Sequence, residues 1–366
     1  MRNKLITLLS LLFAFCLPPN VHAAEYPFND LIFFGDSLSD SGNLYYRTFG
    51  FIPKSPPYFA GRFSNGPTWA ESVADHYKAQ NQMESDNFAV GSASAVFHNP
   101  VKGYLPYTLT MAVYNYLVRY AWYDKTHTLF TIWIGANDYM KGADDVDDAT
   151  TAVVNAIGDN IETLIGREGK YFLLMNLPDI SKTPLGKTSD KAANLSALSE
   201  AHNRKLAIKV AELQKKYPET IIRIYDIYSD FEVLTKDPDV YNKKYNINLT
   251  NITESCWPGW YSRKHLQPDA LAKEIKQHWQ KARGRDADAA KNYVDADQLA
   301  NTIINTPALA VAYGVGKQFD EGDKPCDNPD NHVFWDHVHP SRVVHAVFGN
   351  IMTDFIDKNY LSANQA

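Results

Sequence analysis

Short apolar runs and longer amphipathic segments alternate along most of the chain. The apolar runs are rich in Ile, Leu, Phe and Val, as is typical of buried strands, and lie at 31–34, 87–90, 129–134, 171–176 and 221–226. The longer segments have helical periodicity and lie at 107–124, 149–167, 192–216 and 342–358. Strands that alternate with helices predict an α/β protein whose parallel sheet is covered on both faces, a three-layer α/β/α sandwich.

The alternation becomes less regular between about residues 241 and 330. Charged turns interrupt this region, and only two helical pieces are expected in it, at 270–283 and 295–304. We therefore predict an insertion that lies over the domain and is not a second core. Residues 24–366 would then form a single domain, with its ligand site at the carboxyl ends of the parallel strands.

The amino-terminal residues have the three parts of a secretory signal. A basic start is followed by an apolar run at 5–17, which is too short to span a bilayer easily. Small residues then precede Ala23 at the spacing that signal peptidase recognises. We predict a signal peptide at 1–23, with cleavage after Ala24 as the alternative, and a secreted or periplasmic protein.

The three cysteines bear on the same question. Cys16 offers a lipoprotein anchor as an alternative, although Phe15 before it is larger than the residue a lipobox requires. Removal of the signal would leave Cys256 and Cys326. In an exported protein two cysteines predict one disulfide, and two unpaired thiols are the alternative.

Composition and charge exclude one class of function. Of the 366 residues, 45% are hydrophobic, which is enough for a sizeable core. The net charge of -6 is spread along the chain without a basic block, so no nucleic-acid partner is expected. Aromatic residues make up 13%, which suits apolar or carbohydrate-like ligands as well as a large core.

A polar cluster, FFGDSLSDSGN at 33–43, follows the first predicted strand. A glycine and then a small hydroxyl residue at the end of a strand, here Gly35 and Ser37, can expose a nucleophilic Oγ at the mouth of the sheet. Ser39 replaces the second glycine of Gly-x-Ser-x-Gly, so the nucleophile elbow of α/β-hydrolases is absent. Ser39 and Ser41 are expected to bond their own backbone in a turn.

A candidate base lies near the other end of the chain. Asp336 and His339 are three positions apart, so the carboxylate can reach Nδ1–H in one turn and leave Nε2 to accept a serine proton. Pro340 forces a break directly after this pair. A helix-capping pair is one alternative. A metal cluster that adds Asp330 and His337 is another, and it would leave the serine cluster unexplained.

Four blocks of the sequence, in this order, resemble those of the SGNH, or GDSL, hydrolase family. The blocks are FFGDSLSDSGN at 33–43, Gly91 in NFAVGSASA, Asn137 in TIWIGANDY, and DHVHP at 336–340. Together they cover the chain from residue 31 to about 355. In addition, GRFSNGPTW at 61–69 is similar to a segment of the secreted bacterial branch, which contains phospholipases A, lysophospholipases and glycerophospholipid–cholesterol acyltransferases.

The resemblance implies a role for each block. Ser37 would be the nucleophile, His339 the base and Asp336 the group that orients it. The backbone N–H groups of Ser37 and Gly91 and the side-chain amide of Asn137 would form the oxyanion hole. The residues alone also permit a turn glycine at Gly91 and a helix N-cap at Asn137. The resemblance further implies a flavodoxin-like sheet and neither a cofactor nor a metal.

The resemblance also implies an activity and partners. We expect a secreted serine esterase that hydrolyses lysophospholipids or phospholipids, touches membrane surfaces transiently and transfers acyl groups to a sterol. Alternatives are an esterase of the same fold for acetylated carbohydrates or other small esters, and a non-catalytic lipid-binding protein. Disulfide-bracketed loops serve related secreted enzymes as lids or protease-sensitive switches. Cleavage by a protease near residues 281–285 is therefore expected to change activity, with a stabilising insertion as the alternative.

Overall fold

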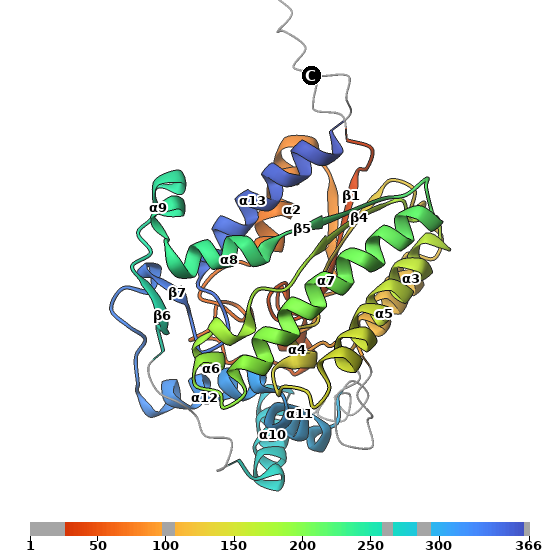
Figure 1. The fold of residues 1–366 in the computed structure, drawn as a ribbon. Helices are drawn as coiled ribbons and strands as arrows, with labels where there is room; N and C mark the ends of the chain where they lie inside the picture. Colours follow the sequence, from red (N-terminus) through yellow and green to blue (C-terminus); the bar gives the residue numbers. More distant parts are fainter. Residues whose placement is uncertain (1–25, 97–106, 258–265, 284–293, 362–366) are drawn as a thin grey trace, which may run out of the picture.

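The structure is a computed structural model that describes residues 26–96, 107–257, 266–283 and 294–361. The predicted signal peptide at 1–23 lies outside the described residues. At the centre of the described part, five parallel strands form a sheet in the order β2-β1-β3-β4-β5 (Figure 1). The strands are β1 (Asp30–Gly35), β2 (Glu84–Asn87), β3 (Thr128–Trp133), β4 (Tyr171–Met175) and β5 (Ile221–Tyr225).

The strand order determines where a ligand site lies. From β1 the chain passes first to β2 on one side and then returns to β3 on the other side. Because the crossover that leaves β1 and the crossover that leaves its neighbour β3 run in opposite directions along the sheet, the topological switch point lies at the carboxyl end of β1, next to that of β3. The polar segment that begins at Asp36 follows this end directly, so the sheet places it where ligands bind in folds of this kind.

Helices cover both faces of the sheet, as the sequence pattern predicts. On one face α5 (Val146–Ile165) packs between α3 (Leu109–Arg119) and α7 (Ala192–Lys216), and on the other α2 (Trp69–Asn81) packs against α13 (Arg342–Tyr360). Right-handed crossovers account for this division, because the chain reverses its direction along the sheet after β2. Shorter helices complete the layers: α1 (Asn43–Arg47), α4 (Ala136–Tyr139), α6 (Pro184–Lys187), α8 (Ile227–Lys236) and α9 (Asp239–Tyr245).

The second predicted strand is wrong in position. The run expected to form it was 87–90, whereas β2 is Glu84–Asn87, a polar and largely exposed segment. The reason is that β2 is an edge strand with a neighbour on one side only, so it does not have the apolar pattern of a central strand. The apolar run continues beyond it, and the N–H groups of Phe88 and Val90 still donate to β1 carbonyls.

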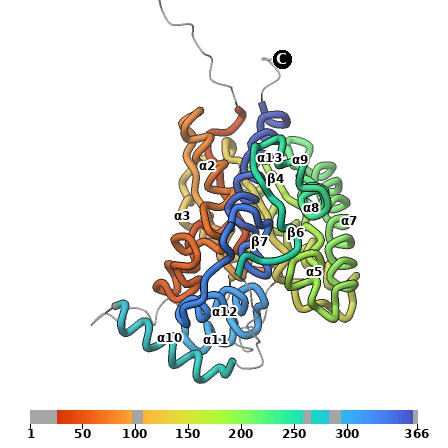
Figure 2. Tube along the Cα trace, turned by 90° about the vertical axis from the view of Figure 1, so that its left-hand side faces the viewer, coloured from red at the N-terminus to blue at the C-terminus, as the bar shows by residue number. Residues whose placement is uncertain are grey.

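The helices between residues 268 and 321 of the 241–330 region lie at the end of the molecule where the strands finish (Figures 1 and 2). The elements of this region are β6 (Asn251–Ser255), α10 (Pro268–Arg283), α11 (Ala296–Asn305) and α12 (Pro307–Glu321), and β6 pairs with β7 (His332–Phe334). The apolar residues of the three helices form a second buried cluster together with Leu44, Tyr58 and Phe63. The cluster is therefore shared between the insertion and the main domain. None of the helices in the described ranges is long and apolar enough to cross a membrane.

Candidate active site

The turn after β1 holds Ser37 at the carboxyl end of the sheet. Gly35 precedes it because a Cβ there would lie 2.7 Å from the carbonyl oxygen of Trp133 on β3. The carbonyl of Asp36 accepts the N–H groups of Ser39 and Asp40, which closes the turn and leaves Ser37 between strand and turn. Ser39 departs from the turn role expected for it, since its buried hydroxyl accepts a hydrogen bond from the indole of Trp69.

The structure brings Asp336 and His339 to this serine. The Oδ1 atom of Asp336 accepts the N–H groups of Val338 and His339 at 2.7 and 2.8 Å, which is the tight turn that the spacing predicts. Its Oδ2 atom lies 2.8 Å from Nδ1 of His339, and Nε2 of His339 lies 2.9 Å from Oγ of Ser37. With Nδ1–H donated to the carboxylate, Nε2 accepts the serine hydroxyl.

Tyr58 completes the surroundings of the aspartate. Its hydroxyl donates to Oδ2 of Asp336 at 2.5 Å, and both residues are buried. Burial raises the pKa of Asp336, but the neighbouring His339 and the hydrogen bonds from His339 and Tyr58 hold it below its ordinary value. Phe63 packs on the imidazole of His339, with ring centroids 5.0 Å apart. Sequence reasoning missed Tyr58, because nothing local marks a contact between residues 278 positions apart.

Two of the three predicted oxyanion donors line one cavity with the serine hydroxyl. Among the described residues no acceptor engages the N–H of Ser37. The amide of Asn137 donates to the carbonyl of Ala93 at 2.9 Å, which leaves it one further hydrogen. The alternative role of Asn137 as an N-cap is wrong, because Gly135 occupies that position of α4 and Asn137 lies within the helix.

The third predicted donor, the N–H of Gly91, already has an acceptor. It donates to Oδ2 of Asp40 at 2.7 Å. A Cβ at Gly91 would lie 2.4 Å from Cε2 of Phe63, so a close side-chain contact accounts for the glycine. The geometry therefore separates Gly91 from Ser37 and Asn137, which have donor hydrogens that no described acceptor engages.

Asp40 is a second residue that sequence reasoning missed. Its buried carboxylate accepts backbone N–H groups from Gly42, Asn43, Leu44 and Gly91. Burial raises its pKa to about 6, and these hydrogen bonds act in the opposite direction. Asp40 thereby ties the serine turn to the loop after β2. The Asp-x-Gly-Asn pattern of an Asx turn is the signal that would have indicated its local bonds.

Asp138, next to Asn137, plays a similar part on the other side of the site. Its two oxygens accept the N–H groups of Ala95 and Val96 at 2.8 and 3.0 Å. Burial raises its pKa to about 7. Since Ala93 also accepts the amide of Asn137, the loop at 91–96 is held to α4 by both residues.

An apolar cavity opens beside the serine hydroxyl. Its walls come from strand ends, from α4, from α8 and from α13, and they are largely apolar. The lining residues include Leu38, Trp133, Met140, Pro178, Ile180, Ile227, Phe231, Phe334, Val338 and Phe348, with Ser37 and Asn137 at one side. Such a surface suits a hydrocarbon chain next to a reacting ester. The sequence does not predict this cavity, because its walls are far apart along the chain.

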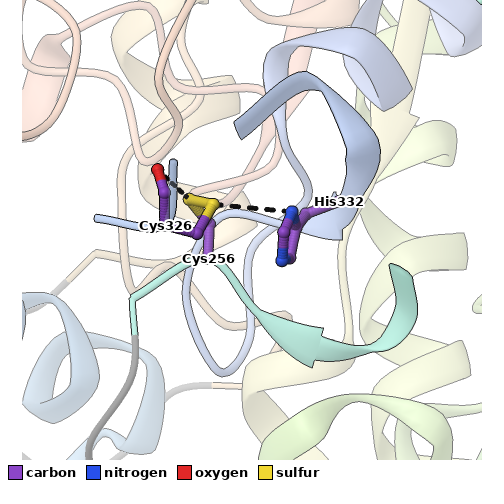
Figure 3. A group of neighbouring side chains, drawn as sticks. All are labelled: Cys256, Cys326 and His332. Atoms are coloured by element: carbon purple, nitrogen blue, oxygen red, sulfur yellow. Dashed lines mark hydrogen bonds between the residues drawn. A yellow bond between two sulfur atoms is a disulfide. The ribbon is translucent and has the colours of Figure 1, made fainter. Parts of the chain in front are cut away.

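The two remaining cysteines form the predicted disulfide. Cys256 and Cys326 are joined, and His332 lies beside them with Nδ1 3.5 Å from the sulfur of Cys326 (Figure 3). These three residues form a potential ligand group, but disulfide sulfurs are not thiolates and do not offer the ligands that zinc needs. In the alternative metal cluster around His339, the carboxylate of Asp330 is already engaged, because it accepts a hydrogen bond from Arg342.

Comparison with known proteins decides the family. The sequence model of GDSL-like lipase/acylhydrolases matches residues 31–352, which spans the sheet, the insertion and most of α13. The chain belongs to the GDSL-like lipase/acylhydrolase family. The resemblance inferred from the four blocks and the three-layer fold are thus confirmed, and the protein is an ester-hydrolysing enzyme.

Three bacterial proteins are similar to this chain in sequence. The phosphatidylcholine-sterol acyltransferase of Aeromonas hydrophila is 28% identical over 91% of this chain and 91% of its own length. The secreted effector protein SseJ of Salmonella typhimurium is 36% identical over 56% of this chain and 48% of its own. The thermolabile hemolysin of Vibrio parahaemolyticus is 30% identical over 62% and 51%, respectively.

Proposed function

We propose that this GDSL-like enzyme hydrolyses acyl esters of phospholipids or lysophospholipids, with Ser37 as nucleophile and His339 as base. The observation that carries the proposal is the buried line from Asp336 through His339 to Ser37, which ends beside an apolar cavity. A base within hydrogen-bond reach of the nucleophile, itself oriented by a carboxylate, is the arrangement that acyl transfer needs.

The chemistry follows from these contacts. Oγ of Ser37 attacks the ester carbonyl while its proton passes to Nε2 of His339, and Asp336 stabilises the imidazolium that forms. The N–H of Ser37 and the amide of Asn137 donate to the oxyanion. His339 then protonates the departing alcohol, which leaves an acyl group on Ser37. Water, activated by the same histidine, releases the fatty acid and restores the serine.

Gly91 has a conditional place in this scheme. Its N–H donates to Asp40, so it contributes to the oxyanion hole only if a substrate oxygen replaces that carboxylate as its acceptor. Ser37 and Asn137 need no such exchange. We therefore assign the resting-state oxyanion donors to these two residues and make Gly91 a third donor that substrate binding recruits.

The cavity and the relatives favour a lipid substrate. The apolar walls next to Ser37 accommodate the first carbons of an acyl chain, whereas an acetylated sugar would need polar groups there. The relative that matches 91% of this chain is named a phosphatidylcholine-sterol acyltransferase, which supports transfer of the acyl group to a sterol hydroxyl as a second outcome. The reaction is the same up to the acyl-enzyme, after which a sterol replaces water.

Labelling with a fluorophosphonate tests the mechanism. Wild-type protein should carry the adduct on Ser37, and Ser37→Ala should carry none. Ser41→Ala is the matched control, because Ser41 lies in the same turn and should leave labelling unchanged. Release of fatty acid from lysophosphatidylcholine, compared with acetate from acetylated sugars and with transfer to cholesterol, then identifies the substrate. An unlabelled wild type, or full activity in Ser37→Ala, would refute the serine mechanism.

Two further parts of the proposal concern the cellular setting. The amino-terminal sequence, the disulfide and a relative named a secreted effector support export of this protein. Cleavage of the insertion near residues 281–285 by a protease is proposed to change activity. This segment begins at the exposed end of α10 and runs on outside the described residues. Unchanged lipase rates after limited proteolysis there would contradict the proposal.

A further inference from the structure

Helix α3 and the turn after it expose a row of large apolar side chains. Trp122 is 97% exposed, and the rest of the row is also exposed: Met111, Tyr114, Val118 and Tyr123. Met111, Tyr114 and Val118 follow one another at intervals of three and four residues, the spacing that places helical side chains on one side, and Trp122 and Tyr123 follow in the turn after the helix. We call these five residues the α3 face.

The fold of α3 does not depend on this row. The opposite side of the helix buries Leu109, Ala112, Val113 and Tyr116 in the main core. The helix begins with a side-chain cap from Thr108, whose hydroxyl accepts the N–H of Met111. Since an exposed hydrophobic row of this size costs solubility and serves neither capping nor core packing, it indicates a partner.

The charge of the segment indicates what kind of partner it is. From Tyr107 to Tyr123 the chain carries one formal charge, that of Arg119, in a protein whose net charge is -6. Arg119 is paired with the carboxylate of Asp86 at 3.2 Å, so the segment presents no net charge, which suits the zwitterionic headgroups of phosphatidylcholine. Trp and Tyr side chains, which have an apolar body and a polar edge, are enriched where acyl chains meet headgroups.

The α3 face is connected to the proposed catalytic residues. The N–H of Leu109 donates to the carbonyl of Ser94, and the N–H of Ser94 donates to the carbonyl of Tyr107. Ser94 belongs to the same 91–96 loop whose Ala93 carbonyl accepts the amide of Asn137. The face thus starts at a loop of the site and extends along the 11 residues of α3, about 16 Å at 1.5 Å per residue, into the turn that holds Trp122.

We propose that the α3 face binds the headgroup–acyl boundary of phospholipid bilayers and so holds the active site at its aggregated substrate. The inference rests on the proposed lipid function and names the surface through which that function would meet a membrane. A second copy of this chain is the other occupant that such a face admits, and the measurements below distinguish the two.

Trp122 makes the proposal directly measurable. The other tryptophans in the described ranges, Trp69, Trp133, Trp257, Trp279 and Trp335, are buried. Ser37→Ala protein, which would not consume the lipid, is mixed with vesicles of phosphatidylcholine, with and without phosphatidylglycerol. We expect the tryptophan emission to shift to shorter wavelength and to be quenched by brominated acyl chains. Trp122→Phe should abolish both responses.

Vesicle affinity provides the second measurement. Val118→Asp places a carboxylate in the face and should weaken binding about tenfold, equivalent to about 1.4 kcal/mol. Ile208→Asp on α7 is the matched control, because Ile208 and Val118 are both 60% exposed. This control should bind like the parent protein. In protein that retains Ser37, Val118→Asp should lower the hydrolysis of vesicle lipid and leave the hydrolysis of a soluble short-chain ester unchanged.

The outcomes separate this proposal from the function on which it rests. If Ser37 is labelled by fluorophosphonate but vesicles leave the emission of Trp122 unchanged, the α3 face is not the membrane surface and the serine mechanism stands. If Ser37 is not labelled, the proposed function fails whatever the vesicles show. Emission of Trp122 that is already shifted without lipid and returns on dilution would overturn the proposal in favour of a dimer through α3.

Discussion

The side chain of Asn137 has three features that bear on its proposed role. Its amide nitrogen donates to Ala93, its Oδ1 is buried without a partner among the described residues, and it lines the cavity beside Ser37. A helix N-cap would need none of these features. They agree with an amide that is kept in place by one hydrogen bond so that its second hydrogen can meet a developing negative charge.

Substitution of Asn137 tests this assignment. Asn137→Ala should lower kcat for a soluble ester about 10²–10³-fold with little change in KM, because the lost hydrogen bond strengthens only in the transition state. Steady-state kinetics measure the split. Asn301→Ala is the control, since that amide donates within its own helix α11. A rise in KM at unchanged kcat would instead indicate that Asn137 merely binds substrate.

At this scale the sequence predicts residues whose partners are near or belong to a known pattern. The turn of Asp336 and His339 could be predicted because both ends of its hydrogen bonds lie within three positions. Tyr58 and Phe63 could not, since their contacts with Asp336 and His339 span more than half of the chain. The partner of Ser39 was wrongly expected in its own backbone, because a buried indole from α2 provides it.

At the scale of elements, a strand is easy to recognise in the sequence when both faces of the sheet bury its side chains. β1 and β3 are central strands and read as continuous apolar runs, whereas the edge strand β2 reads as a polar segment and was placed wrongly. The unpredicted helix α12 contains Gly314 and Gly316, which lower helical propensity. Gly316 is required because a Cβ there would lie 2.9 Å from Cβ of Lys54.

Buried histidines of α7 and α13 give the fold a pH dependence. Burial lowers the pKa of His202 and of His345 to about 3, so both stay neutral in the folded state. In the unfolded chain a histidine titrates near its ordinary pKa of about 6.5. Their contribution is therefore fully present above about pH 6.5 and is lost as the pH falls from there toward 3.

His202 allows this contribution to be measured away from the proposed catalytic residues. Between pH 7.5 and pH 5 it should account for a loss of about 2 kcal/mol in the free energy of unfolding. His202→Phe should reduce this loss by that amount, and the part of the loss that is due to His345 should remain. Urea titrations at both pH values give the comparison, with the exposed His127→Phe as control. An unaltered pH dependence in His202→Phe would contradict the assignment.

At the scale of the whole molecule, the disulfide joins the insertion to the segment that carries the proposed base. Cys256 and Cys326 are 70 positions apart, and beside them β6 pairs with β7, which leads directly to Asp336. The apolar cluster shared with Leu44, Tyr58 and Phe63 provides a second, non-covalent attachment. The sequence predicted the disulfide from the count of cysteines, but not this shared cluster, which depends on contacts between distant segments.

These two attachments predict a graded loss of stability. Replacing both cysteines by serine should destabilise the fold by up to about 4 kcal/mol, the loop-closure value for a loop of this size. At low temperature the variant should still be labelled on Ser37, because the shared cluster remains. The labelling capacity should disappear at a lower temperature than in wild type, as followed by fluorophosphonate labelling along a thermal ramp. No labelling at any temperature would mean that the site does not assemble without the disulfide.

The distance between Ser37 and His339 along the chain is 302 positions. During synthesis the proposed nucleophile, both proposed oxyanion donors and most of the residues that line the cavity are made well before the proposed base. On the proposed mechanism a nascent chain therefore cannot activate Ser37 until β7 and the start of α13 have been added and have packed against the sheet. The mechanism thus predicts that chains which lack the segment around His339 are inactive.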